Sequence, residues 1–515
     1  MRFFQKTRVL IVILSLGLFS FLGEAKAGTA PTGFTDELIV GGLNLPTCTA
    51  LLPDGRMLIT EQKTRDIVLV IGSTLHGSVL NISDVRTTGN ERGLLSIAVD
   101  PNWPTDPYIY TYFSRNGGTN YLTRFTASGD LSDGASTNLT FGDRYDILTD
   151  IPDIASNHNG GTTRFGIDGM LYLSIGDDAV DPCDAQETTN LSGVVLRLNV
   201  AALPSGAGGP ASKALIAAPG NPWITDANDN TKMAFCLGLR NPFKMSIDPD
   251  NGDVFLADVG QSDFEEVSLA RGGENFGWPF REANLVRTQF GCTEPGGSGN
   301  AVYDPPIAFY DRSGFGASII MGVSYRQSQS VGGQYLFPTA YEGVVFFNEY
   351  YQGFVRAIEW DGNAWVPFSA PGQPNATDWG TGFDFVSDWM QHPDGAVYYL
   401  EQLSGQLRRL THPGSSSVPG DGLPIGLRAA PNPLRAGQNL QLQFTAPTEG
   451  PVSLSVFDVE GRALRTLSGN ASAAGDLRME WDGKDVNGRQ TAPGVYFLKL
   501  TGPNWSENKR ITVLP

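Results

Sequence analysis

The stretch TRFGIDGMLYLSIGD, from Thr163 to Asp177, has the pattern of two short strands joined by a tight turn. The dipeptide Asp168-Gly169 favours the left-handed backbone of hairpin turns, and apolar residues lie on both sides of it. The run from Met170 to Ile175 is the second expected strand. The stretch therefore predicts an antiparallel β-hairpin.

The same unit recurs along the chain. Three further segments place an Asp-Gly or Asn-Gly turn between apolar runs, and a fourth is less regular: residues 50–61, 245–258, 390–400 and 95–112. Irregular copies of one antiparallel unit, separated by insertions, are typical of a β-propeller. We expect an all-β fold with a six-bladed β-propeller over residues 28–410 and a site at its central channel.

The composition agrees with a turn-rich all-β protein. The 515 residues include 62 Gly and 33 Pro, and only 17% are charged. The formal net charge of −18 argues against nucleic acid or an anionic membrane as a partner. An acidic surface of this kind is common in soluble secreted proteins, and it does not indicate a cationic substrate.

The N-terminus has the pattern of a secretory signal peptide over residues 1–27. Arg2, Lys6 and Arg8 form a basic region before an apolar run over residues 9–22, and Ala25-Lys26-Ala27 fits a cleavage site. The apolar run is short for a membrane span. We expect a mature chain that starts near Gly28, is secreted, periplasmic or held at the cell surface, and has no transmembrane segment.

A second unit follows the propeller. Residues 411–424 are rich in Gly, Ser and Pro and predict a linker, and residues 425–515 contain runs of alternating apolar and polar residues. This second unit resembles the FlgD-type immunoglobulin-like domain and the C-terminal sorting domains of some secreted bacterial proteins. The motifs that match are Pro431-Asn432-Pro433, Asp458 with Gly461-Arg462, Trp481-Asp482-Gly483 and Gly494-Val495-Tyr496. The resemblance implies a small β-sandwich that serves export or surface attachment and no catalysis.

The cysteine content fits an oxidising compartment. The four cysteines allow three full pairings and form no C-x-x-C motif, so we expect one or two disulfides. Cys183 and Cys236 each lie close to a candidate site motif, and we expect these two to pair, with Cys48 and Cys292 remaining.

His158 is the first candidate for chemistry. It is one of only four His residues, and Gly160-Gly161 follows it at the end of a loop, where backbone can approach a ligand closely. A His in that position is suited to act as a general base. The alternative is a polar loop residue that bonds to backbone.

Two further segments can complete a site. Arg240 and Asn241, just before Pro242, offer a donor fork and an amide that suit a carbonyl or carboxylate group. The alternative for Arg240 is a contact between blades. Carboxylates at Asp258, Asp263, Glu265 and Glu266 are hard oxygen ligands suited to Ca²⁺, and the alternative is a solvated acidic loop.

Together these segments resemble the glucose/sorbosone dehydrogenase family. The matching motifs, in chain order, are Pro53-Asp54-Gly55 with Thr60-Glu61, Glu91-Arg92-Gly93-Leu94-Leu95, His158-Asn159-Gly160-Gly161, Ile175-Gly176-Asp177, Leu196-Arg197-Leu198-Asn199, Gly238-Leu239-Arg240-Asn241-Pro242, Glu265-Glu266 and Gly277-Trp278-Pro279. The resemblance implies a soluble aldose dehydrogenase that uses pyrroloquinoline quinone (PQQ) and Ca²⁺ on a six-bladed propeller, with a sugar as substrate and an unidentified electron acceptor.

The resemblance also implies roles for individual residues. His158 matches the general base that takes the proton of the sugar's C1 hydroxyl group while hydride passes to the quinone. Arg240, the second expected catalytic residue, and Asn241 match residues that contact the quinone oxygens.

The remaining matches concern the metal and the substrate. The carbonyl groups of Gly260 and Gln261 match ligands of the Ca²⁺ on the cofactor, and Glu265 and Glu266 match a structural Ca²⁺ site. Glu91 matches the substrate pocket. We place Asn157 beside Glu91 in that pocket.

The chain departs from the family pattern at three places. Asn157 stands where an Asp orients the catalytic His. Tyr350, Tyr351 and Gln352 stand in the region of a Lys that holds the cofactor's carboxylates. Residues 384–392, just before the turn at Pro393-Asp394-Gly395, contain no Arg, whereas the family has two there. Two alternatives therefore stay open: a non-catalytic propeller that binds carbohydrate or protein, and a Ca²⁺-dependent lactonase-like hydrolase.

Overall fold

A computed structural model describes residues 27–514, except for 296–301, 313–315, 331–332, 413–427, 431–433, 436–437, 447–448, 459–461, 472–474, 487, 493 and 503–504. The expected signal peptide, apart from Ala27, and the expected linker, apart from its first two residues, lie outside the described residues. No helix in the described part of the chain is both long and apolar enough to cross a bilayer.

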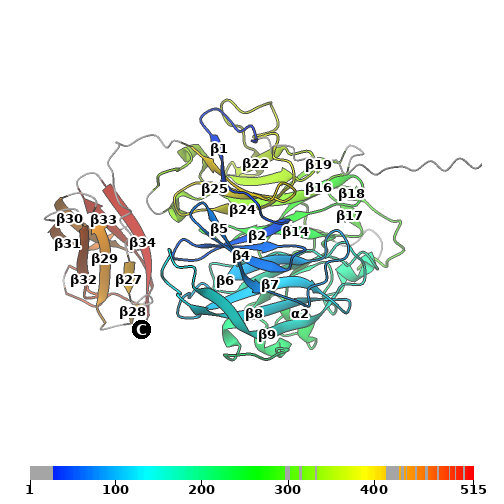
Figure 1. Ribbon diagram of the computed structural model, residues 1–515, viewed down its shortest axis with the longest axis horizontal. Helices are drawn as coiled ribbons and strands as arrows, with labels where there is room; N and C mark the ends of the chain where they lie inside the picture. The colour runs from blue at the N-terminus through cyan, green and yellow to red at the C-terminus, as the bar shows by residue number, and fades with distance from the viewer. Residues whose placement is uncertain are drawn as a thin grey trace, which may run out of the picture.

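Six four-stranded antiparallel sheets form a β-propeller, which confirms the expected fold class (Figure 1). The first three sheets are β2 (Pro46–Leu51), β3 (Met57–Glu61), β4 (Asp66–Ile71) and β5 (Thr74–Asn81); β6 (Leu94–Val99), β7 (Tyr108–Arg115), β8 (Thr119–Gly129) and β9 (Leu139–Pro152); and β10 (Thr163–Phe165), β11 (Leu171–Ile175), β12 (Val194–Leu198) and β13 (Ala234–Leu237). Each of these sheets is built from strands consecutive in the sequence.

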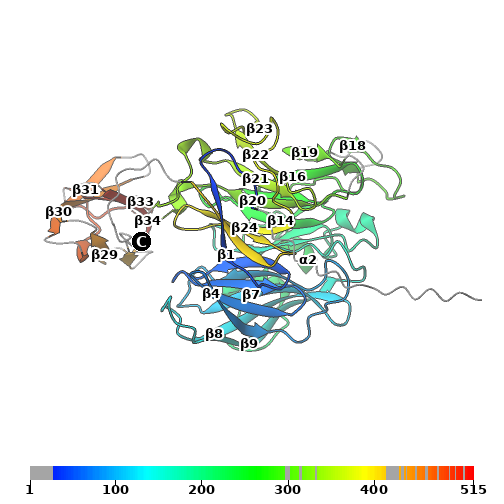
Figure 2. The ribbon, with the colours of Figure 1, turned by 45° about the horizontal axis from the view of Figure 1, so that its top comes forward.

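The other three sheets complete the ring. They are β14 (Pro242–Ile247), β15 (Val254–Asp258), β16 (Phe264–Ala270) and β19 (Ala308–Asp311); β20 (Ile319–Ser324), β21 (Val345–Glu349), β22 (Val355–Trp360) and β23 (Trp365–Pro367); and β24 (Val386–Gln391), β25 (Val397–Glu401), β26 (Gln406–Thr411) and β1 (Thr35–Val40). Figure 2 shows β1, in blue, among the yellow strands of this last sheet. Pairing of the first strand with the last sheet closes the ring.

Short elements lie in the connections between strands of the same sheet. They are β17 (Arg281–Glu282) and β18 (Leu285–Val286), the helices α1 (Lys213–Ile216) and α2 (Asp229–Met233), and the 3₁₀ turns η1 (Pro182–Gln186), η2 (Val200–Ala202), η3 (Gln327–Gln329) and η4 (Thr339–Tyr341). No long helix lies in the described chain, as the sequence indicates.

The hairpin that predicts the fold is present. Thr163 pairs with Leu173 and Phe165 with Leu171, and Gly169 has a φ of 74°, which a residue without a side chain adopts at no steric cost. All five residues of β11 are buried. The first strands of the six sheets contact one another around the ring, so the residues just before these strands lie at one mouth of the central channel.

The residues from 428 onward form a separate body with two sheets (Figure 1). One sheet consists of β27 (Arg428–Ala430), β29 (Leu440–Ala446) and β32 (Gly475–Trp481), and the other of β28 (Leu434–Arg435), β34 (Trp505–Leu514), β33 (Gly494–Gly502), β30 (Gly450–Phe457) and β31 (Ala463–Ala471). Their apolar core, with Leu454, Trp481 and Leu498 at its centre, draws on no propeller residue among those described. This is the architecture of a small β-sandwich.

The disulfide differs from the expected one. Cys183, in η1, bonds Cys292, which follows β18, and their Cα atoms are 5.6 Å apart. The expected pair of Cys183 and Cys236 is wrong because Cys236 lies inside β13 with its thiol buried in an apolar core. Cys183 and Cys292 both lie in insertions, which sequence spacing does not place in space.

Removing this disulfide is expected to destabilise the propeller. The bond closes a loop with a sequence separation of 109, and a closure of that length restricts the unfolded chain strongly. We expect the double variant Cys183→Ser/Cys292→Ser to lose about 3–5 kcal/mol of unfolding free energy in a denaturant titration. A reducing agent should lower the stability of the wild type and leave that of the double variant unchanged. Equal stability of the oxidised wild type and the double variant would contradict this prediction.

Candidate active site

The candidate residues meet at one mouth of the channel. Glu91 precedes β6, His158 precedes β10, and Arg240 and Asn241 precede β14, so three adjacent sheets deliver them to the same place. Hydrogen bonds join them across the sheets: the Gly160 N–H group donates to Asn241 Oδ1 at 3.0 Å, and Asn241 Nδ2 donates to Glu91 Oε2 at 3.2 Å. The residues that the sequence singles out therefore form one site.

His158 is held by a carboxylate. Its Nδ1 lies 2.6 Å from Oδ1 of Asp177, the second residue after β11. Asp177 itself accepts hydrogen bonds from Trp278 Nε1 at 2.8 Å and from the Ala179 N–H group at 2.9 Å. Because a carboxylate only accepts, the neutral form of His158 carries its proton on Nδ1 and has a lone pair on Nε2. The ring therefore bonds to a side chain, not to backbone.

The backbone around His158 is tightly packed. His158 has a φ of 59° and Gly161 a φ of 135°. A Cβ atom on Gly161 would lie 2.2 Å from the ring of Tyr112, and one on Gly176 would lie 2.2 Å from the His158 carbonyl oxygen. The glycines allow this close approach, which fixes the imidazole against the end of β11.

Glu91 lies half-buried behind the His loop. Its Oε2 accepts hydrogen bonds from the Asn159 N–H group and from Asn241 Nδ2, both at 3.2 Å. Burial raises the pKa of Glu91, and His158 and these hydrogen bonds oppose the rise. Asn157, the other expected substrate residue, is exposed beside the site. Asp177, and not the residue at position 157, holds His158.

Arg240 is fixed by the loop after β15. Its Nη1 donates to the Val259 carbonyl at 2.7 Å, and Nη2 and Nε donate to Gln261 Oε1 at 2.7 and 3.0 Å. The backbone N–H groups of Arg240 and Asn241 both donate to Asp258. Burial lowers the pKa of Arg240. A guanidinium held this firmly presents its charge at the mouth in a fixed orientation.

Arg312 lies at the expected metal ligands. Its Nη1 donates to the Gly260 carbonyl and, at 2.6 Å, to Glu265 Oε1, and its Nη2 donates to the Ala317 carbonyl. Glu266 accepts instead from the Ala283 N–H group at 2.6 Å, so the two carboxylates have separate partners. Among the described residues, no group of three or more His, Cys, Asp or Glu side chains could hold a metal ion. As arranged, Gly260 and Glu265 do not fit Ca²⁺, because a guanidinium cation already bonds both.

Glu282 holds the loop that carries these groups. Its Oε1 accepts hydrogen bonds from the N–H groups of residues 261, 262, 263 and 264 at 2.9–3.1 Å, and its Oε2 pairs with Arg287. Gln261, in this loop, is the side chain that fixes Arg240. Glu282 therefore positions Arg240 through the loop.

We expect Glu282→Ala to loosen this loop. Four backbone N–H groups lose their acceptor, and each lost hydrogen bond costs about 0.5–1.5 kcal/mol. Amide hydrogen exchange at residues 261–264 should become faster by at least tenfold. The control Arg287→Met leaves these four bonds in place and should leave the exchange rates nearly unchanged. Unchanged exchange in Glu282→Ala would contradict the role of Glu282.

The region of the absent Lys carries aromatic groups. Tyr351 is 54% exposed, and its ring meets that of Tyr350 edge to face with centroids 4.9 Å apart. Burial raises the pKa of Tyr351, and the nearby carboxylates of Glu91 and Glu349 raise it further. An exposed tyrosine this close to Glu91 offers a flat face at the site, of the kind that packs against sugar rings.

Comparisons with known proteins agree with this geometry. Residues 43–337 match the model of the glucose/sorbosone dehydrogenase family, and residues 432–505 match that of the FlgD Ig-like domain. The chain belongs to the glucose/sorbosone dehydrogenase family. Its propeller is therefore one of a family of oxidoreductases, and the resemblance inferred from the sequence motifs is confirmed.

Relatives in this family include sugar dehydrogenases. Aldose sugar dehydrogenase YliI of Escherichia coli is 25% identical over 287 residues, which cover 55% of this chain and 72% of that protein. Quinoprotein glucose dehydrogenase B of Acinetobacter calcoaceticus is 27% identical over 272 residues, 48% of this chain and 52% of that one. The HIPL2 protein of Arabidopsis thaliana is 32% identical over 220 residues, 40% of this chain and only 30% of that protein.

Solved structures of the family share the fold. A glucose dehydrogenase from Thermus thermophilus is 26% identical, with a TM-score of 0.54. The match spans 73% of this chain and 100% of the Thermus chain. The PQQ-bound aldose sugar dehydrogenase of Streptomyces coelicolor is 22% identical, with a TM-score of 0.54. The match spans 74% of this chain and 99% of the Streptomyces chain. The second likeness concerns the fold alone.

Proposed function

We propose that this protein oxidises an aldose at its C1 hydroxyl group and passes the electrons to PQQ. The observation that carries this proposal is the pairing of His158 with Asp177 beside Arg240 and Asn241, at the mouth of a family propeller. The pair leaves a neutral imidazole nitrogen available as a general base. The wider family includes a quinoprotein and an aldose sugar dehydrogenase, which supports both the acceptor and the substrate class.

The charges at the mouth fit an anionic quinone in part. The guanidinium groups of Arg240 and Arg312 lie close enough for the charge of one to lower the pKa of the other. Such groups bind carboxylates and quinone oxygens well, and the Asn241 amide adds a neutral donor. Arg312 supplies a cation that the sequence does not reveal, since the expected Lys and Arg positions are uncharged. PQQ, when bound, supplies the acceptor for the two electrons and the hydrogen of C1.

The residues of the chain divide the remaining work. His158 Nε2 accepts the proton of the C1 hydroxyl group, and Asp177 stabilises the imidazolium that results. Arg240 and Arg312 would hold the quinone and would supply positive charge that stabilises its reduced form. Glu91 is held by two donors and can accept a hydrogen bond from a sugar hydroxyl, and Tyr351 offers a face for the ring. No step depends on Ca²⁺, because Arg312 already bonds Gly260 and Glu265.

The test is a titration of the full chain with PQQ, followed by dye reduction with a panel of aldoses. Tight binding with aldose-dependent reduction supports the proposal. Binding of an aldose without reduction of the dye at any PQQ concentration would contradict it. That result would favour the second candidate, a carbohydrate-binding propeller, which the uncharged residues Tyr350, Tyr351 and Gln352 favour.

Arg312 gives a prediction about the metal. We expect PQQ affinity of the wild type to be unchanged by a chelator. Arg312→Met should weaken PQQ binding at least tenfold, because one charge-assisted contact is worth about 1.5–3 kcal/mol. Ca²⁺ should restore part of this affinity, since Gly260 and Glu265 are then free to bind it. The control Arg271→Met changes an exposed arginine elsewhere and should have no effect. A loss of PQQ affinity in the wild type on chelation would contradict the role of Arg312.

The location and the C-terminal unit complete the proposal. We infer that the chain is exported through a signal peptide within residues 1–27 and that the propeller occupies residues 28–410. A linker over 411–424 then leads to the sandwich at 425–515, which attaches the protein to the cell surface or to export machinery. Deleting residues 413–515, which leaves β26 whole, should release the propeller into the medium and leave its activity intact.

A further inference from the structure

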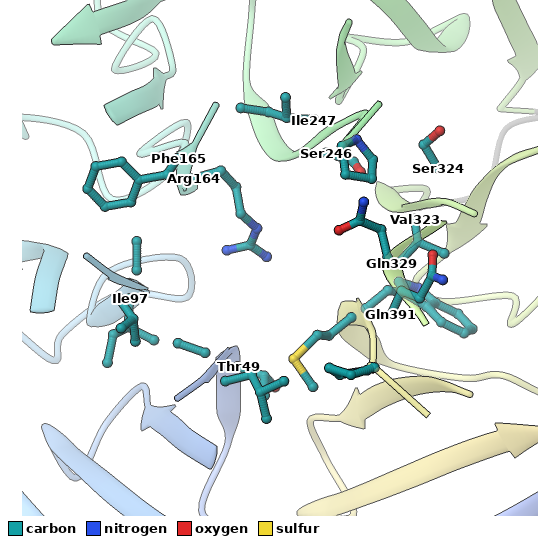
Figure 3. Close-up of a pocket in the computed structure, with 18 residues that line it drawn as sticks. Thr49, Ile97, Arg164, Phe165, Ser246, Ile247, Val323, Ser324, Gln329 and Gln391 are labelled. Atoms are coloured by element: carbon teal, nitrogen blue, oxygen red, sulfur yellow. The ribbon is translucent and has the colours of Figure 1, made fainter. Parts of the chain in front are cut away.

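The other mouth of the channel holds a cavity of about 380 Å³ (Figure 3). All six first strands line it with their later residues: 49–51 of β2, 97–99 of β6, 164–165 of β10, 246–247 of β14, 323–324 of β20 and 389–391 of β24. His158, Glu91 and Asn241 precede three of the same strands, so the cavity and the active site lie at opposite ends of the channel. The residues that line this cavity are different from those of the active site.

One charged side chain faces the cavity. Arg164 is the only Asp, Glu, Lys or Arg among the residues that line it, and Figure 3 shows its guanidinium reaching toward the centre. Its side chain is 24% exposed, whereas Asp388 and Lys244 behind it are 2% exposed. The Arg164 charge is therefore presented to whatever occupies the cavity.

The cluster of Arg164, Lys244 and Asp388 at the cavity has one more cation than carboxylate. Asp388 Oδ1 accepts from Arg164 Nη2 at 2.9 Å and lies 3.3 Å from Lys244 Nζ, so one carboxylate serves two cations. Asp248 forms a separate cluster: it accepts from Ser324 and pairs with Arg326, which also pairs with Asp250 and Glu342. Since an arginine stays protonated, the Arg164–Lys244–Asp388 cluster has an unmatched positive charge.

The cavity also offers unused donors. Arg164 Nη1 donates to the Thr163 carbonyl and to Cys48 Sγ, but its Nε makes no hydrogen bond within the described chain. In the same described part, the hydroxyl groups of Thr49 and Ser246, which line the cavity, bond no other residue. Trp389, Met390 and Pro393 give the cavity an apolar wall beside Thr49. The lining thus combines one cation, two hydroxyl groups and an apolar surface.

We propose that this cavity is a binding site for a small organic monocarboxylate that carries hydroxyl groups, such as a sugar acid. The single unmatched charge fits a monoanion, and a guanidinium with a free Nε–H group suits a carboxylate. The volume falls within the range of small-molecule sites, which is about 300–1,000 Å³. The site does not depend on the proposed dehydrogenase activity.

The test is calorimetric titration of the full chain with gluconate at constant ionic strength, with glucose and acetate as probes of the two halves of the ligand. We expect gluconate to bind with an affinity at least tenfold above that of acetate, and glucose not to bind at this cavity. Arg164→Met should weaken gluconate binding at least tenfold. Equal binding of acetate and gluconate, or no gluconate binding, would overturn the proposal.

Two further variants keep the test decisive. Ser246→Leu fills the cavity and leaves the Arg164–Asp388 pair intact, so it should abolish binding even if Arg164→Met proves unstable. Arg240→Met lies at the opposite mouth and should leave gluconate affinity unchanged. Loss of binding in Arg240→Met with retention in Ser246→Leu would place the ligand at the dehydrogenase site instead and overturn the proposal.

Discussion

Replacing Asp177 with Asn is expected to lower kcat for aldose oxidation by about 10²–10⁴-fold, with little change in the KM for the sugar. Asp177 accepts the Nδ1–H group of His158 at 2.6 Å. An amide NH₂ group at that place would donate to Nδ1 and move the ring proton to Nε2, the atom that must accept the substrate proton. The base would then be present in the wrong tautomer.

A spectroscopic measurement separates this effect from a loss of structure. Nitrogen NMR of the His158 ring should show a proton on Nδ1 in the wild type and on Nε2 in Asp177→Asn. The control Asp178→Asn changes the neighbouring carboxylate, which bonds the N–H groups of Ile154 and Ala155, and should alter kcat less than tenfold. Equal kcat values for Asp177→Asn and the wild type would refute the orienting role of Asp177.

Replacing His158 is expected to lower kcat by a factor of the same size. His158 has a φ of 59°, and Asn tolerates this left-handed backbone better than Ala does, so His158→Asn is the suitable variant. Loss of a general base costs about 10²–10⁴ in rate. The melting temperature and the PQQ affinity should stay nearly constant. His76→Asn removes an exposed His from β5 and serves as the control.

The double variant Asp177→Asn/His158→Asn sharpens this prediction. Two residues that act as one unit are not additive, so the double variant should be no slower than His158→Asn alone. If the loss of kcat in the double variant equalled the product of the two single losses, Asp177 would act on the reaction by another route. A drop in melting temperature that matches the loss of activity would indicate a structural role for His158.

Much of the fold follows from local sequence. The Asp168-Gly169 turn between apolar runs predicts a hairpin because its backbone requirement and the strand pattern agree within a few residues. Repetition of that unit then indicates a propeller. The pairing of β1 with the last sheet cannot be predicted from local sequence, since its partner β26 lies at the far end of the propeller sequence.

The site is predicted less completely than the fold. His158, Arg240 and Asn241 stand out because polar residues before inner strands share one mouth of the channel. The Asp177–His158 contact depends on the loop that folds back over the end of β11, and Arg312 comes from the connection between β19 and β20. Contacts made by insertions depend on closure of the whole ring, and for the same reason the disulfide partner of Cys183 is not visible in the sequence.

The most direct measurement is single-turnover reduction of the PQQ-loaded chain by an aldose, unlabelled and deuterated at C1, in the wild type and in His158→Asn. We expect reduction in the wild type that slows with deuterium at C1, and at least a hundredfold slower reduction in His158→Asn at equal PQQ occupancy. Reduction of His158→Asn at the wild-type rate, or no reduction of the PQQ-loaded wild type by any aldose, would contradict a C1-oxidising site built around His158.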